Sequence, residues 1–189
     1  MIDLRIKGLP KTVLVDGKPF LVVTDFRKWL TFDQLLQKPE IKLFDLWEYI
    51  AQDKKPMDPD ATLKALVDFY LTPSATPNNI GNDSNVKLVD FIKDGEYIYA
   101  SFMQVYGINL VESDMHWHEF KALFNGLPDD CKISKIMAYR AYKKSNKSAE
   151  KIYEEQRDMW AFKEEKSPED AQTMEEIRQL FYKDRKSVV

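Results

Sequence analysis

Signals that start and stop helices recur along most of this chain, and they constrain its fold more than any other feature of the sequence. Capping residues precede apolar positions at helical spacing in several places: Thr24 or Asp25, Asp58, Asp94, Ser113 or Asp114, and Asp129 or Asp130. Gly107 and Gly126 follow two of these segments, where a left-handed glycine would close a helix. The pattern predicts a mainly α fold with about six or seven helices around one main core.

One strand signal stands near the N-terminal end. Residues 12–15 and 20–23 are rich in β-formers and flank Asp16-Gly17, a pair suited to the left-handed positions of a type I′ turn. Pro19 cannot donate a hydrogen bond to a sheet, which favours an edge strand. A two-stranded ribbon is only marginally stable in water, so we expect this hairpin to pack on a helix or on another chain.

Two further segments define the predicted organisation. After Pro39, apolar residues recur at every third position, which predicts another helix: Ile41, Phe44, Trp47 and Ile50. Residues 72–85 (TPSATPNNIGNDSN) are crowded with loop formers and predict a loop. The polar stretch 143–148 is typical of a connection between two structural parts. We therefore expect a mainly helical core domain over 1–144, with the N-terminal hairpin, and a charged C-terminal helical arm over 145–189.

The arm carries two amphipathic segments. The apolar positions are Ile152, Met159 and Trp160 on the first, and Met174, Ile177, Leu180 and Phe181 on the second. Such stripes must be covered by something. They are our candidate partner-binding or self-association residues, so a homo-oligomer is one expectation. The alternative is that both segments fold back onto the core domain.

Both histidines of the chain, His116 and His118, flank Trp117. Residues two apart on a helix project about 200° from each other, whereas the ligands of one metal ion must converge. The spacing of Trp117, Phe120 and Phe124 favours a helix and places these aromatics in the core. We therefore expect one packed histidine, one near solvent, and no stabilisation by zinc or nickel.

No other group of side chains has the pattern of an active site. Cys131 is the single cysteine, which fits a reducing cytoplasm, and it lacks the local signature of a catalytic cysteine. No phosphate-binding glycine motif is present. The net charge of −3 gives no basic footprint for nucleic acid, and no stretch approaches the ~20 apolar residues that span a bilayer. We expect a protein that binds partners, without catalysis, cofactor, nucleic acid or membrane.

Four motifs resemble a known family in their order and spacing. The first motif is Thr24-Asp25-Phe26-Arg27-x-Trp29; the second is Asp94-x-x-Tyr97-Ile98-Tyr99-Ala100-x-Phe102-x-x-x-Tyr106-Gly107-Ile108-x-Leu110; the third is His116-Trp117-x-x-Phe120-Lys121-Ala122-Leu123-Phe124-x-Gly126-Leu127-Pro128; the fourth is Lys135-Ile136-Met137-x-Tyr139-Arg140. They are similar to the gene-product-fifteen family of siphophages and prophages of Gram-positive bacteria. The resemblance covers nearly everything except the loop at 72–85 and the tail past about residue 145.

The resemblance implies a role in building the phage tail. In such phages the gene lies between those of the major tail protein and the tape-measure protein, where tail-assembly chaperones are encoded. The implied function is a chaperone in the host bacterial cytoplasm that binds the tape-measure protein and helps recruit tail-tube subunits made of the major tail protein. The alternative is a structural tail-completion or minor tail component of the virion. The resemblance brings no catalytic residues.

Overall fold

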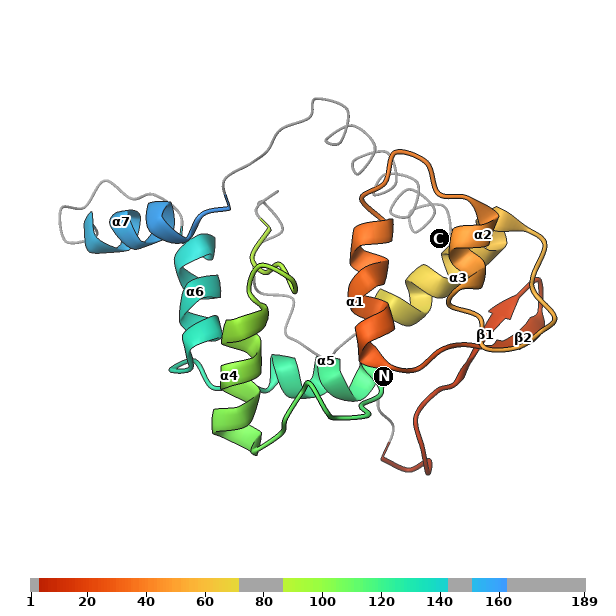
Figure 1. Cartoon of the computed structure of the whole chain (residues 1–189), viewed down its shortest axis with the longest axis horizontal. Coiled ribbons are helices and arrows are strands. Elements are labelled where there is room, and N and C mark those ends of the chain that lie inside the picture. The colour runs from red at the N-terminus through yellow and green to blue at the C-terminus, as the bar shows by residue number, and fades with distance from the viewer. Residues whose placement is uncertain (1–3, 72–86, 143–150, 163–189) are drawn as a thin grey trace, which may run out of the picture. The chain divides into compact units, whose positions relative to one another are not determined.

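The computed structural model describes residues 4–71, 87–142 and 151–162 (Figure 1). Within these residues the elements follow in the order β1 (Thr12–Val15), β2 (Lys18–Leu21), α1 (Phe26–Leu35), α2 (Leu43–Trp47), α3 (Pro59–Leu71), α4 (Gly95–Tyr106), α5 (Trp117–Asn125), α6 (Lys132–Ala141) and α7 (Lys151–Trp160). The predicted mainly α class with an N-terminal hairpin is confirmed. The loop predicted at 72–85 lies outside the described residues.

The hairpin forms around the predicted turn. Asp16 and Gly17 have φ angles of 51° and 72°, the left-handed pair that a type I′ turn requires. β1 pairs antiparallel with β2 and packs against α3, which supplies the helical support that the ribbon needs. β2 begins and ends two residues earlier than predicted, and Val22, which follows it, bridges to Ile50.

The described residues divide into two compact units. One holds 4–71 and 115–118, and the other holds 87–114, 119–142 and 151–162. The single main core, the core domain over 1–144 and the arm over 145–189 stay predictions, since periodicity shows which face of a helix is buried but not what buries it. α5 belongs to both units: Trp117 and His118 are part of the first, and its remaining residues are part of the second.

The core of the first unit is built around Trp29. Its ring is fully buried, and its Nε1 donates a hydrogen bond to the carbonyl oxygen of Val23 at 2.7 Å. Asp25 caps α1 as predicted, because its carboxylate accepts a hydrogen bond from the backbone N–H of Arg27. Aromatic rings surround Trp29: Phe32, Tyr49, Phe69, Tyr70 and Trp117.

The predicted helix after Pro39 is shorter than its apolar pattern indicates. α2 ends at Trp47, and the Nζ of Lys55 donates hydrogen bonds to the carbonyl oxygens of Trp47 and Ile50. Ile50 leaves the helix because its backbone bridges to Val22. Phe44 is 72% exposed, so the apolar residues that recur at every third position after Pro39 do not all lie on one buried face.

The second unit packs α4, α5 and α6 around an aromatic pair. The rings of Phe102 and Phe120 stack with their centroids 5.3 Å apart, and both side chains are buried. Trp117, in the first unit, is also buried, whereas Phe124 is only half-buried. The core prediction is confirmed for Trp117 and Phe120 but not for Phe124.

One glycine ends its helix as predicted: Gly107 closes α4 in the left-handed region, with φ at 67°. The end of α5 and the start of α6 differ from the prediction. Gly126, which follows α5, has no positive φ. A Cβ on Gly126 would instead lie 3.3 Å from the hydroxyl oxygen of Tyr106, which donates to the carbonyl oxygen of Leu123. At the start of α6 the capping position belongs to Cys131, not to either of the two aspartates before it.

Candidate partner-binding surface

The second and fourth motifs meet in a buried ion pair of the second unit. Arg140 donates two parallel hydrogen bonds to the carboxylate of Asp94, at 2.6 and 2.9 Å, and the two side chains are 5% and 3% exposed. Asp94 was predicted to cap α4, but it makes no side-chain capping bond and also accepts the backbone N–H of Asp90. Asp94 does occupy the predicted N-cap position of α4, but its side chain makes no capping hydrogen bond because the arginine fork engages both carboxylate oxygens.

The same arginine fastens the end of α7. Its Nε donates to the carbonyl oxygen of Trp160 at 2.7 Å, and one terminal nitrogen donates to the carbonyl oxygen of Leu88 at 2.9 Å. The guanidinium carbon lies 3.8 Å from the centroid of the Phe162 ring. Arg140 therefore positions α7 on the second unit and ties that position to Asp94.

One face of α7 is turned toward α6 and α4. The rings of Trp160 and Tyr97 meet edge to face with their centroids 5.5 Å apart. The Nζ of Lys132 lies over the Trp160 ring, 4.6 Å from its centroid. One heptad earlier, the Tyr153 ring stacks on Tyr142 at 5.5 Å. We call Tyr153 and Trp160 the inner face of α7, although the Tyr153 side chain is itself 52% exposed.

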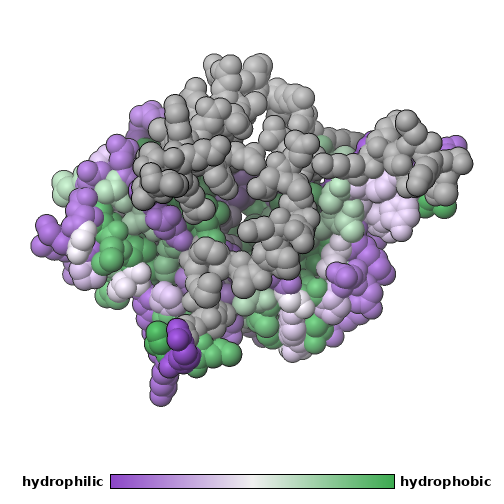
Figure 2. Space-filling model, turned by 180° about the vertical axis from the view of Figure 1, so that it is seen from behind, coloured by the Kyte–Doolittle hydropathy of each residue, from purple (hydrophilic) through white to green (hydrophobic). Residues whose placement is uncertain are grey.

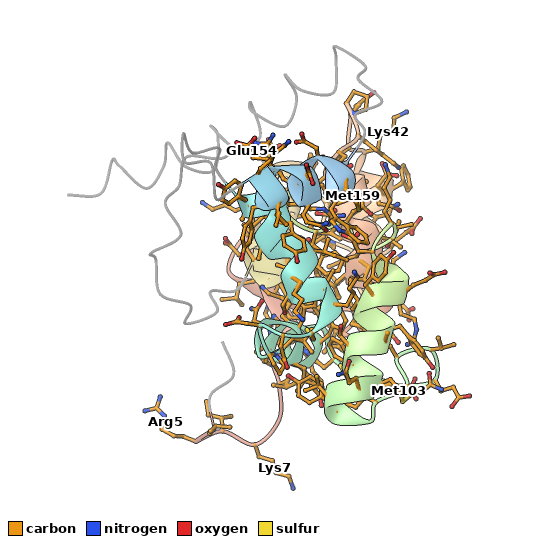
Figure 3. The ribbon with its side chains drawn as sticks, turned by 90° about the vertical axis from the view of Figure 1, so that its left-hand side faces the viewer. Arg5, Lys7, Lys42, Met103, Glu154 and Met159 are labelled. Carbon is orange, nitrogen blue, oxygen red and sulfur yellow. The ribbon has the colours of Figure 1, made fainter. Side chains whose placement is uncertain are left out.

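The other side of α7 is open to solvent. Ile152 and Met159 are 69% and 68% exposed, and they lie one heptad apart on the same side of the helix. Figure 3 marks Met159 on α7. Glu155 lies between them and is also exposed. We call Ile152, Glu155 and Met159 the outer face of α7.

The structure divides the first of the two predicted stripes. Trp160 follows Met159 directly and is therefore about 100° further round the helix, on the inner face. Ile152 and Met159 remain the candidate partner-binding residues of this segment. The rest of the candidates lie outside the described residues: Met174, Ile177, Leu180 and Phe181.

The charges of α7 are mixed. Arg157 donates to the Asp158 carboxylate at 2.7 Å, and this hydrogen bond raises the pKa of the Arg157 guanidinium above its ordinary value. Lys151 and Glu155 are exposed nearby. No single sign of charge dominates the helix, so recognition here would depend on the apolar anchors Ile152 and Met159.

Exposure alone does not distinguish these two anchors. Figure 2 shows apolar atoms scattered between polar ones over the face that it displays, and single exposed apolar residues are normal. Phe44 and Met57, in the first unit, are 72% and 74% exposed. What distinguishes α7 is a pair of anchors one heptad apart on a helix whose neighbouring face, about 100° round, is held through Trp160.

The two histidines have structural hydrogen bonds. His118 is buried, and its Nε2 donates to the carbonyl oxygen of Phe69 at 3.0 Å. His116 is half-buried and precedes α5; its Nδ1 accepts the backbone N–H of His118, and its Nε2 donates to the carbonyl oxygen of Pro10. The expected packed and near-solvent histidines are confirmed.

The geometric reason given for these histidines was wrong, however. α5 begins at Trp117, not after Ser113 or Asp114, so His116 is not part of the helix but the capping residue that precedes it. The two imidazole rings lie 5.1 Å apart. The described residues contain no group of three or more side chains that could hold a metal ion. The absence of zinc or nickel stabilisation stays a prediction.

The capping role of His116 can be tested with two substitutions. His116→Ala removes the acceptor for the His118 N–H and should lower the free energy of unfolding by about 1 kcal/mol. His116→Asn should retain most of the stability, because an asparagine amide oxygen caps helices well. Urea denaturation of both variants measures the difference. Equal destabilisation by Asn and Ala would contradict the capping role.

The remaining reactive groups do not converge with this surface. Cys131 is buried, with its sulfur 3.1 Å from the hydroxyl oxygen of Ser134. Partial burial lowers the pKa of the Lys121 ammonium to about 8. Among the described helices, none has the length and apolar character needed to cross a bilayer.

Comparison with protein families gives one result. The family model described as bacteriophage Gp15 protein matches residues 6–166. Comparisons with curated proteins and with solved structures give no match. The matched range includes all of α7, so it extends past residue 145, where the resemblance was expected to fade, and it ends before Met174.

Proposed function

This chain belongs to the bacteriophage Gp15 protein family, and from that premise we propose that it is a tail-assembly chaperone that binds the phage tape-measure protein. In this proposal it also helps to recruit tail-tube subunits, formed by the major tail protein, and acts in the host bacterial cytoplasm. The observation that carries the proposal is the outer face of α7. It presents apolar anchors within the part of the chain that the family model matches.

The spacing of these anchors supports an amphipathic helix as the bound element. Ile152 and Met159 are about 10 Å apart along α7, because each helical residue rises 1.5 Å. Apolar residues one heptad apart on a partner helix have the same separation, so both anchors can be covered by a single helix face. A long helical protein such as a tape measure offers many such faces.

The way α7 is held also supports binding. Trp160 and Tyr153 occupy the inner face, and the Trp160 carbonyl is held by Arg140. A helix that is already positioned loses less conformational entropy when a partner binds. The proposed activity is therefore recognition of a helix, without a chemical step.

Two measurements test the proposal. The chain, co-expressed with the tape-measure protein of the same phage, should co-purify with it. Mass spectrometry of finished virions should not detect the chain, because a chaperone leaves before the tail is complete. A fixed copy number in virions would contradict the chaperone role and favour the structural tail-completion or minor tail component.

A further inference from the structure

The hairpin of the first unit has one occupied edge and one open edge. The backbone N–H of Leu21 donates to the side chain of Gln52, and the Leu21 carbonyl oxygen accepts the N–H of Ala51. Residues 50–52 therefore occupy the outer edge of β2, where Pro19 has no N–H to donate. Among the described residues, no segment pairs with the other side of the hairpin, which we call the open edge of β1.

The pairing register shows which backbone groups point to this open edge. Thr12 lies opposite Leu21, and Leu14 lies opposite Pro19. Leu21 directs its backbone groups away from β1, so Thr12 directs its own away from β2. The alternation of an antiparallel ladder gives Leu14 the same direction as Thr12. Each of these two residues thus presents an N–H donor and a C=O acceptor at the open edge.

Apolar side chains flank the open edge on the outer face of the hairpin. Leu14 and Leu21 are 68% and 47% exposed on that face. The inner face is the buried one, with Val13, Val15 and Phe20. β1 contains no charged residue, proline or bulge, the features with which proteins usually protect an edge strand. An edge of this kind favours pairing with another strand.

The charges at the two ends of β1 favour a second copy of the same strand as that partner. Lys11 precedes β1 and Asp16 follows it, and both are exposed, while Lys18 lies one strand further from the open edge. Antiparallel pairing of two copies brings each Lys11 near the Asp16 of the other copy, whereas parallel pairing would bring like charges together. In charge, β1 is therefore complementary to itself in the antiparallel direction.

We propose that two copies of this chain form a dimer by antiparallel pairing of their open β1 edges, which gives a continuous sheet in the order β2-β1-β1-β2. Thr12 of each copy pairs with Leu14 of the other, about a two-fold axis at Val13. On the outer face, Leu14 then lies between Pro19 of its own chain and Thr12 of the second copy. The dimer does not depend on the proposed function.

Other registers lose some of these hydrogen bonds. A shift by one residue would oppose backbone groups that point to the open edge with groups that point to β2. A shift by two residues in one direction would oppose Thr12 with Asp16, whose φ of 51° lies outside strand geometry. A shift by two in the other direction would oppose Leu14 with Pro10, which has no N–H.

Cysteine cross-linking of the full-length chain tests the register. In an equal mixture of Thr12→Cys and Leu14→Cys chains, the two thiols occupy directly opposed positions with Cα atoms about 5.5 Å apart, within the range of a disulfide. Each variant alone is a matched control, because its two copies place their thiols diagonally, about 7–8 Å apart. Cys131 is 3% exposed, so the introduced thiols are the accessible ones.

The expected result is a covalent dimer that forms at least about tenfold faster in the mixture than in either variant alone. Equal rates in the mixture and in the separate variants would overturn the proposal, and so would the absence of any cross-link. Faster cross-linking in one variant alone would overturn the register, and with it the proposal.

Analytical ultracentrifugation tests the dimer independently. The wild type should sediment as a dimer, and Leu14→Lys should raise the dimer dissociation constant at least about tenfold, because a lysine on an edge strand opposes pairing. Leu21→Lys is the matched control, with the same substitution on the same face but one strand away from the open edge, and it should leave the constant unchanged. Circular dichroism checks that each variant is folded.

A wild type that is monomeric throughout the accessible concentration range would overturn the proposal, as would equal dissociation constants for Leu14→Lys and Leu21→Lys. If Leu14→Lys does not fold, the cross-linking comparison decides the proposal by itself.

Discussion

Arg140→Met is expected to lower the free energy of unfolding by about 3–5 kcal/mol, because it leaves the Asp94 carboxylate buried without its countercharge. Asp94 is 3% exposed and receives both hydrogen bonds of the arginine fork. The substitution also removes the donor to the Trp160 carbonyl, so the fluorescence of Trp160 against Tyr97 should change. Equilibrium denaturation in urea measures the loss.

Arg157→Met is the matched control for this prediction. Arg157 also donates to an aspartate, Asp158, but that pair lies at the surface, with the Asp158 side chain 68% exposed. Surface ion pairs contribute at most about 1 kcal/mol. The double variant Asp94→Leu/Arg140→Met should recover part of the loss, because no buried charge remains. A loss for Arg140→Met no larger than for Arg157→Met would refute the role of the buried pair.

Phe120→Ala is expected to cost about 3–5 kcal/mol of unfolding free energy, as buried phenylalanine truncations do. The side chain is 1% exposed, and its ring contacts those of Phe102 and Phe91 at centroid distances of 5.3 and 6.0 Å. The substitution would leave a cavity among aromatic rings that cannot collapse fully. Thermal and urea denaturation both report it.

Phe124→Ala provides the comparison, because Phe124 lies one helical turn further along α5 and is half-buried. It should destabilise the protein by a smaller amount than Phe120→Ala. A Phe120→Ala variant that melts like the wild type yet fails to bind its partner would place Phe120 on a binding surface and not in the core.

The parts of the fold that the sequence predicts well are local. The Asp16-Gly17 turn and the Asp25 cap depend on residues within a few positions of each other, so their signals are contained in short stretches. The mainly α class follows from the same kind of signal. These features need no knowledge of which elements meet.

The features that could not be predicted from the sequence depend on contacts between residues far apart in the chain. Asp94 has the sequence context of a helix cap, yet its partner, Arg140, is 46 residues away. His116 caps α5 through its Nδ1, while its Nε2 donates to the carbonyl oxygen of Pro10, 106 residues earlier in the chain. The split of the first arm stripe has a similar cause, since Tyr97 and Lys132 draw Trp160 to the inner face.

The motifs that carried the family resemblance prove to be structural. Trp29 of the first motif stacks with Trp117 of the third, and Asp94 of the second pairs with Arg140 of the fourth. A family pattern of this kind identifies the fold more readily than the binding site. The candidate surface on α7 had to be found from burial, since its anchors belong to none of the four motifs.

Calorimetric titration of the tape-measure protein into three forms of the full-length chain tests the central claim most directly: the wild type, Met159→Glu and Met57→Glu. Both methionines are exposed, at 68% and 74%, so a glutamate should be tolerated at either position without unfolding. We predict that Met159→Glu weakens binding at least about tenfold, equivalent to 1.4 kcal/mol, while Met57→Glu binds like the wild type. Wild-type affinity for Met159→Glu, or an equal loss for Met57→Glu, would contradict a binding site on the outer face of α7.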